Sequence, residues 1–145
     1  MLLGHLENLT FATAFGGDNG IGGVFSLDPH TGNFLTLFSF SGRPIDGTVS
    51  AVNVIRDSGG NLYGTTLAGG QNPNFDCQIL ANGCGTVYKI DGQTHQETVL
   101  HTFSFNDGLQ PVGLALDHAG NFIGAVSLGD NFDCRDPINP VNILG

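Results

Sequence analysis

Hydrophobic residues along this chain fall in short runs that alternate with polar residues, and glycine-rich turns separate the runs. In the range 34–40 the even positions carry three phenylalanines and a threonine, whereas the odd positions carry two leucines and a serine. A two-residue period places alternate side chains on opposite faces of a β-strand. No segment keeps a 3.6-residue apolar period, so we expect an all-β protein with almost no helix.

The same pattern predicts a series of short strands along the chain. Turn-forming pairs such as Asp28-Pro29 and Asp46-Gly47 separate them, because aspartate, proline and glycine favour tight turns. The predicted strands are 9–14, 24–27, 34–40, 51–56, 62–66, 86–90, 98–105 and 112–116, followed by the segment 120–126.

One stretch of this pattern occurs twice. Residues 60–66 (GNLYGTT) return as residues 120–126 (GNFIGAV), and an Asp-x-x-Gly turn precedes each copy. We expect the turn aspartates to cap backbone N–H groups, which is a structural role. The repeated turn residues are Asp57, Gly60 and Asn61 in the first copy and Asp117, Gly120 and Asn121 in the second.

The neighbouring strands repeat as well. Residues 86–90 match 23–27, and residues 98–105 lie over 33–40, which aligns His101 with Thr36. One unit is then four short strands in an antiparallel meander, a pattern typical of a β-propeller blade. The fold expected is therefore all-β, with four-stranded antiparallel blade repeats arranged as in a propeller.

The repeats divide a single β-repeat region, residues 1–145, into parts. We expect a partial blade at 1–40, a complete blade at 51–105, the start of a third at 112–128 and a truncated insertion loop at 129–145. About two to two and a half units are present, whereas propellers close with roughly four to eight blades. The expectation is that the remainder belongs to a longer repeat protein, or that other copies of the chain satisfy the open edges.

The order of motifs in residues 57–108 resembles the GloVer tandem repeat. The motifs are DxxGNLYGTT, GTVYKI, TVLHTF and a final Asp-Gly, and weaker likeness extends over residues 9–128. This resemblance implies a bacterial extracellular or cell-surface β-repeat protein of undefined activity. It implies no catalytic residues.

Composition narrows the classes of partner. The chain has 4 basic and 13 acidic residues, which gives a net charge of −9, and 23 of its 145 residues are glycine. Nucleic-acid binding needs clustered Lys and Arg, so we exclude it together with binding to anionic membrane surfaces. No apolar run reaches the ~20 residues of a membrane helix, so membrane insertion is not expected.

The three cysteines are the most informative polar residues. Cys77 and Cys84 lie in the insertion at 67–85, where we expect a disulfide, with free thiols and a metal site as the alternatives. Cys134 repeats the setting of Cys77, since NFDC occurs before both. Its partner is expected beyond Gly145 or on another chain.

Other candidate sites are weak. Acidic loops at 17–20 and 130–136 could bind calcium, but neither has the spacing of a known calcium loop. Asn8 begins the sole Asn-x-Thr glycosylation sequon. The five histidines lack metal-binding spacing, and neither a nucleophile elbow nor a phosphate loop occurs. We expect no metal, no cofactor and no catalytic residue.

Three functions remain after these exclusions. The first is a non-enzymatic extracellular β-repeat module that acts as a scaffold or binding surface. The second is a structural subunit of a secreted filament or ring, assembled by β-strand complementation between chains. The third is a propeller-type hydrolase or lyase, which would need carboxylates or histidines on the strands nearest the axis.

Overall fold

The computed structural model describes residues 8–42, 46–50, 53–70, 83–104, 107–128 and 141–142, and every regular element among them is a β-strand. The expected all-β class is confirmed. In the same residues, no helix has the length and apolar character needed to cross a membrane. The strands are β1 (Leu9–Thr13), β2 (Gly23–Leu27), β3 (Phe34–Ser39), β4 (Gly47–Ser50), β5 (Ile55–Arg56), β6 (Leu62–Gly69), β7 (Thr86–Ile90), β8 (Glu97–Thr102), β9 (Leu109–Leu116), β10 (Phe122–Leu128) and β11 (Val141–Asn142).

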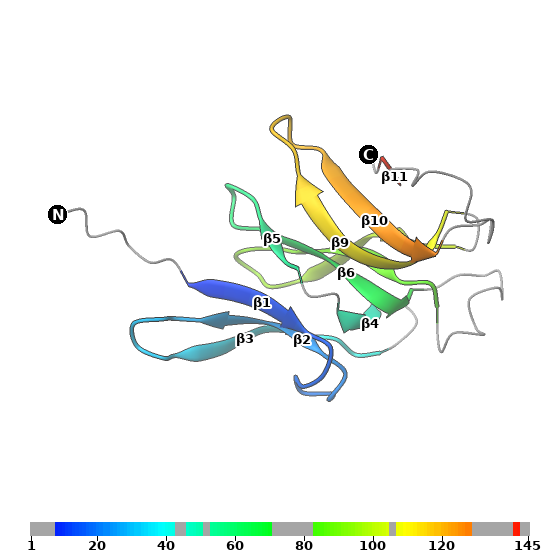
Figure 1. Ribbon diagram of the computed structural model, residues 1–145. Coiled ribbons are helices and arrows are strands. Elements are labelled where there is room, and N and C mark those ends of the chain that lie inside the picture. The colour runs from blue at the N-terminus through cyan, green and yellow to red at the C-terminus, as the bar shows by residue number, and fades with distance from the viewer. Residues whose placement is uncertain are drawn as a thin grey trace.

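The strands form three antiparallel sheets that follow one another along the chain. The first sheet has the order β1-β2-β3, and the third has the order β11-β10-β9. The central sheet has the order β4-β6-β7-β8, with β5 beside β6. Figure 1 shows these sheets as successive layers, with β1–β3 on one side of the central sheet and β9–β10 on the other.

The central sheet contains the expected four-strand meander, but its first strand differs from the prediction. A strand was expected over 51–56, whereas the structure has β4 before that range and β5 at its end. The pairing Gly47↔Gly69 extends β4 and β6 into segments expected to be loops. A β-carbon on Gly47 would overlap Thr66, so glycine permits this close pairing, and a hydrophobic pattern does not reveal it.

The strand pairing also corrects the alignment of the repeats. Val24 pairs with Phe38, and Val87 pairs with His101. His101 therefore corresponds to Phe38 and not to Thr36, so the predicted alignment was wrong by two residues. The sequence Phe-Ser-Phe, which occurs at 38–40 and at 103–105, had suggested the predicted alignment. A register shift follows Val24 in one sheet and Val87 in the other, so strand pairing and not this shared sequence sets the correspondence.

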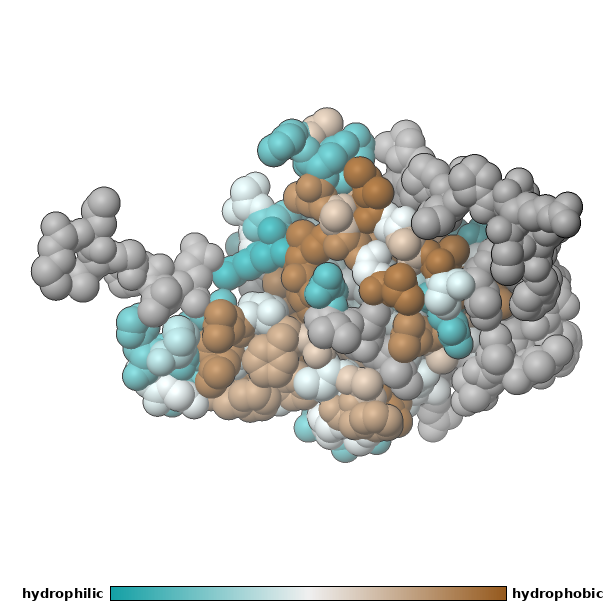
Figure 2. Space-filling view, viewed as in Figure 1, coloured by the Kyte–Doolittle hydropathy of each residue, from teal (hydrophilic) through white to brown (hydrophobic). Residues whose placement is uncertain are grey.

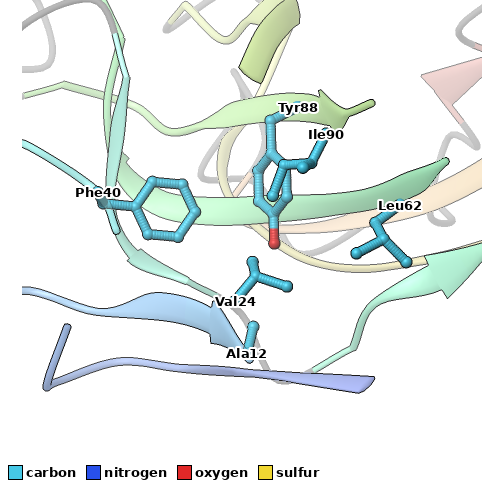
Figure 3. Packing of buried hydrophobic residues seen from close by; sticks show 6 residues of the cluster. All are labelled: Ala12, Val24, Phe40, Leu62, Tyr88 and Ile90. Carbon is cyan, nitrogen blue, oxygen red and sulfur yellow. The ribbon is translucent and has the colours of Figure 1, made fainter. Parts of the chain in front are cut away.

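Two hydrophobic clusters separate the three sheets. The first cluster lies between the first and central sheets, and Figure 3 shows Tyr88 reaching from the central sheet toward Val24 and Ala12. The second cluster lies between the central and third sheets. Its buried members are Cys84, Val87, Phe103, Leu109 and Leu114, whereas those of the first are Ala12, Val24, Phe40, Leu62, Tyr88 and Ile90.

Candidate interaction surfaces

The central sheet is buried on both faces, because its strands contribute to both clusters. Leu62 and Tyr88 pack in the first cluster, whereas Tyr63 and Val87, their neighbours along the strands, pack in the second. Successive strand residues point to opposite faces. Each face of this sheet is therefore covered by another sheet.

Strand pairing defines which residues of the first sheet are equivalent to these. Leu9 pairs with Leu27 as Leu62 pairs with Ile90, so Leu9 is the equivalent of Leu62. Leu62 is 4% exposed and Leu9 is 55% exposed. The same hydrophobic position is thus buried in the central sheet and open in the first sheet.

The outer face of the first sheet, which we call the first open face, is aromatic. Ala12 and Val24 point into the first cluster, so their strand neighbours Phe11 and Phe25 lie on the opposite face. The Phe25 and Phe34 rings stack with centroids 5.1 Å apart. The face comprises Leu9, Phe11, Phe25, Leu27 and Phe34.

Aromatic contacts within this face replace the covering that a neighbouring sheet would supply. The Phe11 ring lies 6.0 Å from that of Phe25 and 6.1 Å from that of Phe34. Phe25 is equivalent to Tyr88, and it is buried beneath its two aromatic neighbours. Phe34 itself remains 59% exposed.

The outer face of the third sheet, which we call the third open face, is aliphatic. Phe122 and Val126 pack against the second cluster, so Ile123 and Ala125 lie on the opposite side of β10. Ala115 pairs with Ile123, and Val112 lies at the register shift in β9. Ile123 is 48% exposed and Val112 is 50% exposed. Figure 2 shows hydrophobic residues in brown over β9 and β10 and over the first sheet.

The repeated turn residues form two matching Asx turns. The Asp57 carboxylate accepts hydrogen bonds from the backbone N–H and the side-chain amide of Asn61, at 2.8 and 2.9 Å. Asp117 and Asn121 form the same pair at the same distances. Hydrogen bonds from the asparagine side chains lower the pKa of both aspartates. Gly60 and Gly120 follow in the left-handed region, at φ 86° and 88°.

A second polar cluster joins the end of β8 to the next turn. Nε2 of His101 lies 2.8 Å from Oδ2 of Asp107, and the hydroxyl of Ser104 donates to Oδ1 of Asp107 at 2.6 Å. Burial raises the pKa of Asp107, but hydrogen bonds from Ser104 and His101 outweigh it and lower the pKa overall. Ser104 bonds to the carboxylate and not to the imidazole, so this arrangement differs from an activated serine nucleophile.

Asp46 is buried and Glu97 is part-buried, and the sequence pattern singled out neither carboxylate. Oδ2 of Asp46 accepts the Ser41 backbone N–H at 2.6 Å. Oδ1 of Asp46 and Oε1 of Glu97 are buried without a hydrogen-bond partner. Burial, together with the nearby charge of Asp46, raises the pKa of Glu97 to about 7. Glu97 pairs with Ile90 across β7 and β8, so it lies on the face of the central sheet that packs against the first cluster. This position can be known only from the strand register.

Several predicted sites lie wholly or partly outside the described residues. Cys84 is buried in the second cluster, but Cys77 and Cys134 are not described, so the disulfide and the role of Cys134 stay predictions. Asn8 is exposed just before β1, and its glycosylation stays a prediction. Within the ranges that are described, no group of three His, Cys, Asp or Glu could hold a metal ion. The acidic segment at 130–136 lies outside the described residues.

The open faces themselves could have been found from the sequence only with the correct register. Leu9, Phe34 and Ile123 look like ordinary core residues, because a hydrophobic pattern does not tell whether another sheet covers them.

In comparisons with protein-family models and with curated proteins, no family model and no curated protein matches this chain. The resemblance to GloVer repeats stays a prediction.

Proposed function

We propose that this chain is a non-enzymatic extracellular β-repeat module, in which sheets stack as propeller blades do and act as a scaffold with binding surfaces. The main support for this proposal is the difference in exposure between equivalent positions of the three sheets. The central sheet is covered on both faces by flanking sheets, while Leu9, the equivalent of buried Leu62, and Ile123, the equivalent of part-buried Tyr63, are exposed. Exposed contiguous apolar surface marks interaction sites in soluble proteins.

The polar groups also favour a scaffold over an enzyme. Asp57, Asp107 and Asp117 direct their carboxylates to backbone N–H groups or side chains of their own turns. Such contacts order the connections between strands. We therefore assign these aspartates to structure, with the loops and open faces as the binding regions.

An apolar fluorescent dye tests the proposed binding surfaces. At micromolar protein concentration, the folded chain should enhance the fluorescence of anilinonaphthalene sulfonate, and Ile123→Lys should reduce that enhancement. Leu100→Lys is the matched control, because Leu100 is 44% exposed on β8 of the central sheet. Absence of dye binding by the folded, monomeric protein would contradict the proposal.

A thiol count tests the extracellular assignment, since disulfides persist in oxidising compartments. If Cys77 and Cys84 form a disulfide, a thiol reagent should detect one free thiol among the 3 cysteines of the denatured, unreduced protein. Cys84→Ser should raise the count to two. Three thiols in protein secreted through an oxidising compartment would contradict the disulfide.

Strand complementation is a second candidate function, and the first sheet favours it. In the central sheet β4 and β5 pair with the edge of β6, whereas among the described residues β1 pairs with β2 alone. An unpaired strand edge offers N–H and C=O groups to another chain. Proline substitution at Thr10 should then block assembly without affecting dye binding at the third open face.

A further inference from the structure

We propose that the third open face of one copy docks on the first open face of a second copy, in a head-to-tail contact between sheet faces. This inference rests on the proposed function, since it assumes that the sheets are stacking units. The two contacts inside the chain supply the template. We call the face of a sheet that points toward the next sheet along the chain its forward face, and the opposite face its backward face. In each contact, the forward face of one sheet packs against the backward face of the next.

The forward faces carry short side chains at an equivalent position. Ala12 is buried against the central sheet, and its equivalent Thr65 is buried with its hydroxyl 3.2 Å from the carbonyl of Pro111 in the third sheet. Thr65 precedes Ala125 by one 60-residue repeat. Ala125 is exposed, so the third sheet presents a forward face that no described strand covers.

The backward faces carry large side chains. In the central sheet these are Leu62, Tyr88 and Ile90, which receive Ala12 and Val24 of the preceding sheet. Their equivalents in the first sheet are Leu9, Phe25 and Leu27. Among the described residues, the first sheet therefore presents an uncovered backward face. The uncovered forward face of the third sheet is the type of surface that packs against a backward face inside the chain.

The matched surfaces differ from each other, so the contact is heterologous. A heterologous contact joins copies into a ring if the rotation closes, and into a filament if it does not. It requires no exchange of strands and leaves the β1 edge free. Each chain carries a net charge of −9, so copies repel one another and added salt should strengthen the association.

Complementation between two variants tests the contact directly. Sedimentation velocity over a concentration series should show wild-type species heavier than the 15.1 kDa chain. Ile123→Lys removes the third open face and Phe34→Lys removes the first, because each buries an unpaired charge in the contact. Each variant alone should associate at least about tenfold more weakly, which corresponds to the usual effect of a disrupted interface core.

A mixture of the two variants should form a dimer of about twice the chain mass, because Ile123→Lys retains the first face and Phe34→Lys retains the third. Leu9→Lys provides a second first-face variant in case Phe34→Lys lowers stability. Leu100→Lys should assemble as the wild type does. Wild-type protein that stays at 15.1 kDa, unaffected assembly in both face variants, or a mixture without dimers would overturn the inference.

The dye experiment separates this failure from failure of the proposed function. Folded wild-type protein that binds dye but remains monomeric would overturn self-association and leave a binding module for another partner. Folded protein that is monomeric and binds no dye would overturn both. Assembly that Thr10→Pro abolishes and the face variants do not affect would assign association to the β1 edge and overturn the face contact.

Discussion

The first sheet and the central sheet use similar strands in different surroundings. Leu9 and Leu62 hold the same place in their sheets, yet one is exposed and the other is buried. Phe25 and Tyr88 are also equivalent, and both are buried. A strand's sequence therefore selects an apolar face, whereas the neighbouring sheet decides whether that face becomes core.

The two sheets cover their large central ring by different means. Tyr88 lies over Gly64, where a β-carbon would overlap the phenol. The first sheet has Phe11 at the equivalent of Gly64, and its ring covers Phe25 instead. A ring buried between sheets needs a small partner beside it, whereas a ring at an open face is covered by a large one.

The largest expected difference between the sheets comes from truncating the equivalent leucines. Leu62→Ala should lower the free energy of unfolding by about 2 to 5 kcal/mol, because it leaves a cavity in the first cluster. Leu9→Ala should cost less than about 1 kcal/mol, because water already reaches that side chain. Urea unfolding of dilute protein measures both. Equal losses would refute the difference in burial.

The glycine beneath Tyr88 should give the next largest effect. Gly64→Ala forces the Tyr88 ring to move and should cost about 1 to 3 kcal/mol, as overpacking does. Gly124→Ala is the matched variant in the third sheet, where the nearest atom is Cδ2 of Leu114 at 3.1 Å. The flexible leucine can yield, and the next atom, the Gly113 carbonyl oxygen, lies at 3.2 Å, so the loss there should be smaller than at Gly64. Thermal unfolding compares the two.

Glu97 should make stability depend on pH in a direction opposite to that of the turn aspartates. Its pKa is raised to about 7 by burial and by Asp46, so the folded state favours the protonated form. Stability should fall as pH rises from about 4.5 to about 7, by about 1 to 2 kcal/mol after allowance for solvent screening. Glu97→Gln should remove this slope and stabilise the protein at pH 8.

The aspartate of an Asx turn supplies the control for that slope. Hydrogen bonds from Asn61 lower the pKa of Asp57, so its stabilising contribution is present above its ordinary pKa and is lost as pH falls below it. Asp57→Asn should therefore change stability near neutral pH and leave the slope between pH 4.5 and 7 intact. A slope that Glu97→Gln does not alter would contradict the role of Glu97.

The smallest expected effect lies in two equivalent turns. Asp28 and Asp91 each accept hydrogen bonds from the second and third residues that follow them. The turn of the first sheet then has Gly32 at φ 72°, and that of the central sheet has His95 at φ 56°. His95→Gly should stabilise the protein by about 0.5 kcal/mol, as relief of left-handed strain exceeds the added chain entropy. Gly32→His should have the opposite sign, and chemical denaturation resolves both.

The sequence predicted several local features because each depends on near neighbours. The Asp57 and Asp117 turns followed from a repeated Asp-x-x-Gly-Asn pattern, and the strands β2 and β7 followed from short apolar runs between turns. The strand β4 was missed, since its pairing at Gly47 with Gly69 rests on the absence of a β-carbon and not on hydrophobicity. His101 was misaligned because a register shift carries no signature in the residue letters.

The candidate surfaces needed more than local pattern. Ile123 and Ala125 were recognisable as strand residues, but which face they occupy depends on Phe122 and Val126 packing against the central sheet. Glu97 was indistinguishable from a solvated turn carboxylate until its place beside Ile90 was known. Both are long-range properties, set by segments distant in the sequence.

The all-β class, the repeated turns and the alternation that gives each strand an apolar side could all be predicted from the order of residues. Those properties follow from backbone preferences and from the two-residue period of a strand. The burial of Leu62 and the exposure of Leu9, in contrast, became apparent only from the packing of the sheets. Burial depends on which sheet stacks on which, and that stacking is fixed by the summed fit of many distant side chains.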